Sequence, residues 1–203
     1  MKIICIGLNY RRHAMEMGRP FPDEPVVFLK PDSSLLKNNK PFFLPDFSSE
    51  IHYEAEVVIK ISKLGKGILT KYAHRYYDEV TAGIDITARD LQTKLSKARL
   101  PWEISKCFDG AAPIGKFVQV SSFKDINNLN FRLEINSRIV QQSNTGDMIF
   151  NTDQLVSYVS RFFTLKTGDL IFTGTPSGVG PLYHNDHLVA YIEDMPLLDF
   201  MIK

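Results

Sequence analysis

Segments with the apolar pattern of β-strands outnumber helical segments about two to one in this sequence, and the two kinds do not alternate along the chain. A parallel sheet favours such alternation, because a crossover between parallel strands usually carries a helix. The sequence therefore predicts a β-rich α+β fold with a few short helices. The expected strands are Lys2–Ile6, Val26–Leu29, Glu54–Ile61, Val80–Ile86, Phe131–Ile135, Leu170–Phe172, Leu188–Tyr191 and Leu197–Ile202. The expected helices are Arg11–Met17, Lys71–Tyr77, Ala88–Ala98 and Thr152–Phe162, the last capped by Asn151 or Thr152.

The chain has 203 residues without a repeat, a low-complexity tract or a recognisable linker, and β-rich single domains often reach this length. We therefore expect one domain over residues 1–203. Its 24 Lys and Arg balance 23 Asp and Glu, which gives a net charge of +1 without long runs of like charge. This distribution argues against a nucleic-acid partner, because phosphate contacts dominate the affinity of such proteins.

The apolar start of the chain is interrupted by Asn9, Arg11 and Arg12, and it lacks the small-residue cleavage site of a signal peptide. No apolar run approaches the roughly 18 residues that span a bilayer. The 2 cysteines are too few for a disulfide scaffold. These features predict a cytoplasmic protein without a membrane partner.

Two glutamates, Glu54 and Glu56, occupy alternate positions at the start of a predicted strand. Their side chains would share one face, roughly 6–7 Å apart at the backbone, close enough to converge on one cation. A solvent-facing strand edge is the alternative, although Val58 follows on the same face. Burying two like charges there without a metal would be costly.

A third carboxylate, Asp85, lies among apolar residues near the end of another predicted strand, just before a helix. Helix capping explains it poorly, because Thr87 lies nearer the helix start. Asp85 could join the two glutamates in an all-oxygen site for a hard cation. Arg89 and Gln92 share a face of the following helix and could both meet a substrate; an ordinary surface face is the alternative.

The first predicted helix carries His13 and Glu16 three positions apart, so the carboxylate can hold the imidazole in one tautomer. Such a pair can activate a water molecule, although solvent-exposed His–Glu pairs are also common on helices. Gly18 and the proline-rich stretch that ends at Pro22 could form a hinge.

Two further features each have two interpretations. Lys106 stands among apolar residues, where a lysine either serves a site or extends its ammonium to solvent. Residues 173–180, TGTPSGVG, are rich in glycine but match neither a phosphate-binding loop nor G-x-G-x-x-G. The backbone N–H groups of this loop could contact a ligand oxygen, or the loop is a plain tight turn.

In their order along the chain, these segments resemble the fumarylacetoacetate hydrolase family, most closely its acylpyruvase and oxaloacetate decarboxylase branch. Each motif alone is common, whereas the ordered set over nearly the whole chain is specific to the family. The motifs are Gly7-Leu8-Asn9-Tyr10 with His13 and Glu16, Phe28-Leu29-Lys30-Pro31, Tyr53-Glu54-Ala55-Glu56, Asp85 with Thr87-Ala88-Arg89-Asp90, Leu100-Pro101-Trp102 with Lys106, Gly168-Asp169-Leu170-Ile171, and residues 174–180.

The resemblance implies a mixed-sheet roll that usually forms homodimers. It implies that Glu54, Glu56 and Asp85 bind Mg²⁺, or alternatively Mn²⁺ or Ca²⁺. It further implies that His13 and Glu16 are the catalytic dyad, carried on a lid at residues 11–22 that becomes ordered over bound substrate. It also implies that Lys106 lies near the reacting oxygen. By the same resemblance, Arg89, Gln92 and Thr175 contact the substrate, and Leu8, where some relatives carry a basic residue, bears on specificity.

The implied activity is Mg²⁺-dependent hydrolysis of a C–C bond in acylpyruvate-type 2-oxo acids, through an enolate held on the metal. The same enolate arises when oxaloacetate loses CO₂, so decarboxylation is a companion activity. The alternatives are an enol–keto isomerase of the 2-hydroxyhepta-2,4-diene-1,7-dioate type and a non-catalytic 2-oxo-acid-binding protein. The presence of both His13 and Glu16 argues against the last, because binding alone needs neither.

Overall fold

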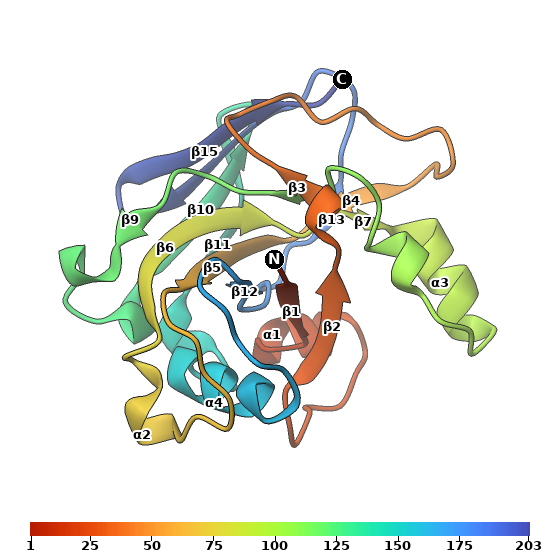
Figure 1. The fold of residues 1–203 in the computed structure, drawn as a ribbon. Helices are drawn as coiled ribbons and strands as arrows, with labels where there is room; N and C mark the ends of the chain where they lie inside the picture. Colours follow the sequence, from red (N-terminus) through yellow and green to blue (C-terminus); the bar gives the residue numbers. More distant parts are fainter.

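The computed structural model describes residues 1–203, and its largest element is a six-stranded mixed sheet (Figure 1). The pairing of β1 with β12 is parallel, and the other neighbours are antiparallel. The predicted β-rich α+β fold is thereby confirmed, including its mixed sheet. In spatial order the strands are β2 (Val26–Lys30), β1 (Ile3–Gly7), β12 (Leu170–Phe172), β5 (Ala55–Ile61), β6 (Tyr77–Ile84) and β9 (Val118–Gln119).

The remaining strands form three smaller sheets. An antiparallel four-stranded sheet contains β11 (Arg138–Asn144), β10 (Asn130–Ile135), β14 (His187–Ile192) and β15 (Met195–Met201). A three-stranded sheet contains β13 (Gly180–Pro181), β4 (Ile51–Tyr53) and β7 (Thr87–Ala88). The last sheet is the parallel pair of β3 (Leu35–Leu36) and β8 (Ala112–Pro113).

The helices are short, and α3 stands apart from the other three (Figure 1). The α-helices are α1 (Arg11–Glu16), α2 (Thr70–Ala73), α3 (Arg89–Lys97) and α4 (Thr152–Phe162). The 3₁₀ turns are η1 (Asp32–Ser34), η2 (Glu103–Ser105), η3 (Val120–Ser122), η4 (Ile126–Asn128) and η5 (Thr145–Asp147). The predicted cap of α4 is confirmed at Asn151, which forms a capping box with Gln154.

Three predicted boundaries were wrong in ways that bear on the site. The helix expected over Lys71–Tyr77 ends at Ala73, because Tyr77 pairs with Ile61 and begins β6. The strand expected to reach Ile86 ends at Ile84, so Asp85 lies just beyond it. Glu54 lies between β4 and β5 rather than inside a strand.

The two faces of the six-stranded sheet bury different clusters. On β5, Val57 and Ile59 belong to the large core, whereas Val58 belongs to a smaller cluster with Phe172 and Cys5. Because strand residues alternate between faces, Glu56 shares the face of this smaller cluster. The smaller cluster therefore supports the sheet face that carries the glutamate.

No helix in the structure is long and apolar enough to cross a membrane.

Candidate active site

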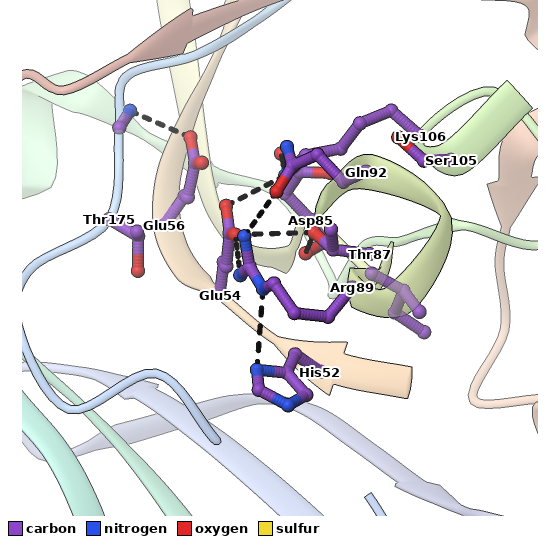
Figure 2. Close-up of polar contacts among 12 residues, drawn as sticks. His52, Glu54, Glu56, Asp85, Thr87, Arg89, Gln92, Ser105, Lys106 and Thr175 are labelled. Atoms are coloured by element: carbon purple, nitrogen blue, oxygen red, sulfur yellow. Dashed lines mark hydrogen bonds and ion pairs between the residues drawn. The ribbon is translucent and has the colours of Figure 1, made fainter. Parts of the chain in front are cut away.

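Three carboxylates, those of Glu54, Glu56 and Asp85, converge in the structure (Figure 2). One oxygen atom from each lies within 4.8 Å of the others, and all three residues are buried. Strand pairing explains the convergence: Glu56 lies opposite Gly83 on β6, and the Asp85 N–H donates to the Glu54 carbonyl at 2.8 Å. The burial excludes the solvent-facing alternative for the two glutamates.

Three buried or nearly buried cations lie against this cluster, and Figure 2 shows two of them, Arg89 and Lys106. The Lys106 ammonium donates to Glu54 Oε2 at 2.8 Å and to Asp85 Oδ2 at 2.6 Å. The Arg89 guanidinium donates to Glu54 Oε1 at 2.5 Å. The third cation is Lys30, whose Nζ lies 2.8 Å from Asp85 Oδ1. The snorkelling interpretation of Lys106 is excluded, because its ammonium points into the carboxylate cluster.

Sequence reasoning assigned no role to Lys30. Its ammonium donates to the carbonyl oxygens of Ile86, Lys106 and Ala111, which uses all three of its protons. Asp85 Oδ1 therefore has a positive charge beside it but no hydrogen bond. The signal in the sequence was a lysine directly after the apolar strand residues 26–29, which is not where a solvated lysine is expected.

The cluster shifts the pKa values of its members in opposite directions. Burial would raise the pKa of Glu54, but Lys106 and Arg89 outweigh burial and hold this pKa well below its ordinary value. Burial and the neighbouring Asp85 raise the pKa of Glu56 well above its ordinary value. For Lys106, burial is outweighed by Asp85 and Glu54, which raise its pKa. Glu56 is thus the carboxylate with the least compensation from protein cations.

The donor set fits a hard divalent cation. Asp85 Oδ1 is buried without a hydrogen bond, and the only hydrogen bond of the Glu56 carboxylate comes from the Gly174 N–H at 2.7 Å. These two carboxylates therefore keep free lone pairs that face a shared space with Glu54. Carboxylate oxygens are the ligands that Mg²⁺, Mn²⁺ and Ca²⁺ prefer. The three residues could hold such an ion.

The His13–Glu16 pair is formed on α1. His13 Nδ1 lies 3.0 Å from Glu16 Oε2, and Glu16 Oε1 accepts a hydrogen bond from the Gly178 N–H at 3.0 Å. His13 is buried and lines the pocket above the carboxylates, whereas Glu16 does not line it. Glu16 therefore lies behind the imidazole and fixes its orientation.

Local features position α1 over the sheet. The Asn9 side chain donates to the carbonyls of Phe150 and Thr173 and accepts from the Phe150 N–H, which ties the start of α1 to the loop after β12. The helix ends in a Schellman motif, in which Gly18 has a φ of +61° and Arg19 N–H donates to the Ala14 carbonyl at 2.9 Å.

The glycine-rich loop at residues 173–180 contacts protein carboxylates with its N–H groups. Gly174 donates to Glu56 and Gly178 to Glu16. Both glycines have positive φ, and a Cβ at Gly178 would lie 2.8 Å from the Val140 carbonyl oxygen. Thr175 lines the pocket, and its hydroxyl accepts a hydrogen bond from the Gln141 side chain at 2.9 Å.

Helix α3 is anchored at its N-terminal end. Arg89 donates to Gln92 Oε1 at 2.5 Å and to His52 Nδ1 at 3.4 Å. Burial and the nearby Arg89 lower the pKa of His52. Asp90 faces away from the pocket and accepts a hydrogen bond from the Ser48 hydroxyl. This hydrogen bond and those from neighbouring donors lower the pKa of Asp90, although its slight burial acts in the opposite direction. The shared-face interpretation of Arg89 and Gln92 holds, since both line the pocket.

The resulting pocket has a volume of about 680 Å³. Every site residue predicted from the sequence except Glu16 lines it, and so do Met17, Arg19, Pro20 and Pro22 from the candidate lid. Phe28 and Trp102, whose rings pack edge to face at 5.2 Å, add an apolar wall. A pocket of this size suits a small-molecule ligand.

Comparison with known proteins finds the same architecture elsewhere. The model of the fumarylacetoacetate hydrolase C-terminal family matches residues 2–202. A mitochondrial oxaloacetate decarboxylase of Dictyostelium discoideum is 44% identical over 182 residues, which is 89% of this chain and 84% of that protein. An oxaloacetate tautomerase of Escherichia coli is 38% identical over 190 residues, which is 93% of this chain and 87% of that protein. The solved structure of fumarylpyruvate hydrolase from Pseudomonas aeruginosa, in complex with Mn²⁺ and pyruvate, has a TM-score of 0.93 and 33% identity, with 100% of this chain and 89% of that chain covered.

Proposed function

Because the chain belongs to the fumarylacetoacetate hydrolase C-terminal family, we propose that it is a divalent-metal-dependent hydrolase that cleaves a C–C bond of acylpyruvates. These are 2-oxo acids with a second carbonyl two carbons further on. The observation that carries the proposal is the position of His13, which lines the same pocket as the three carboxylates while Glu16 holds its Nδ1 from behind. Decarboxylation of oxaloacetate is the proposed companion activity, and residues 1–203 form the single catalytic domain.

Glu54, Glu56 and Asp85 would hold the cation, Mg²⁺ or Mn²⁺. When bound, the cation supplies Lewis-acid polarisation of the 2-oxo acid. The three carboxylates are already matched by the charges of Lys30, Lys106 and Arg89. A divalent ion would therefore leave the site with an excess positive charge, which suits an anionic substrate.

The side chains around the cluster have complementary roles. His13 accepts the proton of the water that attacks the distal carbonyl, and Glu16 stabilises the imidazolium that forms. Lys106 donates a hydrogen bond to the oxyanion that develops on that carbonyl. The C–C bond then breaks, the acyl part leaves as a carboxylic acid, and pyruvate leaves as an enolate that takes up a proton at C3.

Binding and enclosure fall to the walls of the pocket. Arg89, Gln92 and Thr175 present donors and a hydroxyl toward the substrate carboxylate. Residues 11–22 act as a lid, and Met17 and Pro20 cover the pocket with apolar surface. Excluding bulk water there strengthens each electrostatic contact inside.

A second candidate is enol–keto tautomerisation of a 2-oxo acid. It is favoured by the 38% identity to an oxaloacetate tautomerase, and it needs only a base that moves one proton. His13 can do this without an attacking water molecule.

A substrate panel separates the two candidates. Protein stripped of metal with a chelator and then reloaded with Mg²⁺ or Mn²⁺ is assayed with acetylpyruvate, fumarylpyruvate, keto-oxaloacetate and enol-oxaloacetate. We expect metal-dependent hydrolysis of at least one acylpyruvate. Turnover of enol-oxaloacetate alone would support the tautomerase, and no metal-dependent turnover of any acylpyruvate would contradict the hydrolase.

A further inference from the structure

A buried glutamine, Gln141, links two parts of the candidate site. It lies on β11, is 2% exposed and does not line the pocket. Its side chain reaches from the four-stranded sheet to the start of β5 and to the glycine-rich loop after β12. Gln141 can therefore act on a bound ligand only through a residue that it contacts.

The amide of Gln141 uses its oxygen and both of its N–H groups. Oε1 accepts a hydrogen bond from the Ala55 N–H at 2.9 Å. Nε2 donates to the Pro176 carbonyl at 3.0 Å and to the Thr175 hydroxyl oxygen at 2.9 Å. A backbone N–H can only donate and a carbonyl can only accept, so Ala55 and Pro176 fix which way the amide faces.

The fixed amide sets the polarity of the Thr175 hydroxyl. Because Nε2 faces it, the hydroxyl oxygen accepts this hydrogen bond, and its own hydrogen is left for another acceptor. The structure gives that hydrogen no acceptor within the protein. Thr175 is buried but lines the pocket, so the hydrogen is available to a ligand oxygen there.

The neighbours of this hydroxyl belong to the carboxylate cluster. Gly174, directly before Thr175, donates from its N–H to Glu56 at 2.7 Å. Ala55, the partner at the other end of the glutamine amide, lies between Glu54 and Glu56 in the chain. A ligand bound beside the cluster therefore comes close to the hydroxyl.

We propose that Gln141 is a positioning residue, which makes the Thr175 hydroxyl a hydrogen-bond donor to a carboxylate or enolate oxygen of the ligand. The inference rests on the proposed function in one respect, namely that a 2-oxo acid binds beside the cluster. Carboxylate and enolate oxygens carry lone pairs and no hydrogen, so a fixed donor stabilises them, whereas a fixed acceptor would repel them. Gln141 thus favours anionic oxygen at this position without touching the ligand.

The first step of the test establishes the donor. Oxalate is a non-reacting anion with only acceptor oxygens at neutral pH, and calorimetry measures its binding to the Mg²⁺-loaded protein. Thr175→Val removes the hydroxyl with little change in shape, and we expect it to raise the dissociation constant of oxalate by a factor on the order of ten. The affinity for Mg²⁺ without oxalate should stay unchanged.

The second step reverses the polarity. Gln141→Glu keeps an acceptor for the Ala55 N–H but has no N–H for Thr175. The hydroxyl then donates to the introduced carboxylate and turns its lone pairs toward the pocket, so oxalate binding should again weaken by a factor on the order of ten. Gln142→Glu is the matched control, because Gln142 is the next residue of β11 and is exposed. It adds the same charge, and its effect should stay below about twofold.

The double variant separates the hydroxyl from the added charge and from a general loosening of the loop. With Thr175→Val already present, Gln141→Glu should weaken oxalate binding by less than about threefold, since only the charge effect remains. Gln141→Met, which adds no charge, enters the same comparison and replaces Gln141→Glu if that variant does not fold by circular dichroism.

The outcomes separate this inference from the proposed function. Wild-type oxalate affinity in Thr175→Val would overturn the inference, and so would equal losses from the Gln141 variants with and without the hydroxyl, even if the protein hydrolyses acylpyruvates. A loss that depends on the hydroxyl would support the inference even if no acylpyruvate is hydrolysed. Failure of the metal-loaded wild-type protein to bind oxalate would overturn both.

Discussion

At the scale of single residues, the site is a set of buried charges in which Glu54 and Asp85 have cation partners and Glu56 has none. Glu54 gains most from this arrangement, since Lys106 and Arg89 lower its pKa in spite of burial. Asp85 has two lysines beside it, of which only Lys106 donates a hydrogen bond to it. Lys30 acts on Asp85 through charge alone, so its removal is a direct test of how this network is held together.

Lys30→Met is expected to destabilise the fold by about 3–5 kcal/mol, because it leaves a buried carboxylate with less compensation and three carbonyl groups without their donor. Chemical denaturation measures the change. Lys60→Met is the control, since the Lys60–Glu79 pair is partly exposed and its loss should cost less than about 1 kcal/mol. Equal losses in the two variants would contradict a structural role for Lys30.

Glu16→Gln tests whether Glu16 acts through His13. We expect kcat to fall by a factor on the order of 10²–10⁴, because a neutral amide cannot stabilise the imidazolium. Oxalate affinity should stay unchanged, since Glu16 does not line the pocket. A double variant with His13→Ala should be no slower than His13→Ala alone. Additive losses in kcat would show that Glu16 has a separate role.

At the scale of elements, the loop at residues 173–180 connects the two halves of the site. Gly174 holds Glu56 of the carboxylate cluster, and Gly178 holds Glu16 behind the imidazole. Asn9 fixes the start of α1 to the carbonyl of Thr173 in the same loop. The distance between the dyad and the cluster is therefore set by one loop rather than by the two elements independently.

Gly178→Ala is expected to lower kcat more than it lowers stability. A Cβ there would lie 2.8 Å from the Val140 carbonyl oxygen, so the loop must shift and weaken the hydrogen bond to Glu16. Gly168→Ala is a matched control, because Gly168 also has positive φ, at +90°, but a Cβ there meets nothing within 4 Å. Both variants should lose about 1–2 kcal/mol from backbone strain. Equal kcat values would contradict the role of the loop.

Across the whole molecule, the sequence predicted the long apolar elements well and the short polar ones poorly. The strand at Leu170–Phe172 and the helix at Thr152–Phe162 have the predicted bounds, because apolar patterns and a capping residue are local signals. Strand β11 was missed because only Ile139 and Val140, near its start, are apolar, and β13 because two residues are too few to show a periodic pattern. β13 pairs with the distant strand β4, whereas β11 pairs with its neighbour β10 in a hairpin.

The candidate site likewise contains residues that the sequence predicted and residues that it did not. The convergence of Glu54, Glu56 and Asp85 was predictable, since carboxylates among apolar residues require compensation. The role of Lys30 was not, because its carbonyl partners come from segments 56 to 81 residues away. The face of α3 that lines the pocket was visible only in part, as Arg89 and Gln92, because a polar helix face indicates solvent until the opposite wall of the pocket is known.

Three exposed apolar residues flank the pocket-lining Phe28 and Trp102 in the chain, which bears on the expected homodimer. One of them is Leu29 on β2. The other two, Leu100 and Ile104, follow α3 in the chain, and Ile104 is 63% exposed. These segments are neighbours, since the Cys107 thiol bonds to the Leu29 carbonyl at 3.0 Å. Exposed apolar residues on neighbouring segments are often found at an interface between protein chains.

We expect light scattering to give twice the mass of one chain, and Ile104→Lys to shift the protein toward the monomer, because a charge at the centre of an apolar contact must be desolvated. Leu64→Lys is the control, since Leu64 is exposed to a similar extent, 64%, but lies on the loop after β5. The monomer should keep its fold by circular dichroism. A dimer that survives Ile104→Lys would place the interface elsewhere, and a wild-type monomer would contradict the homodimer itself.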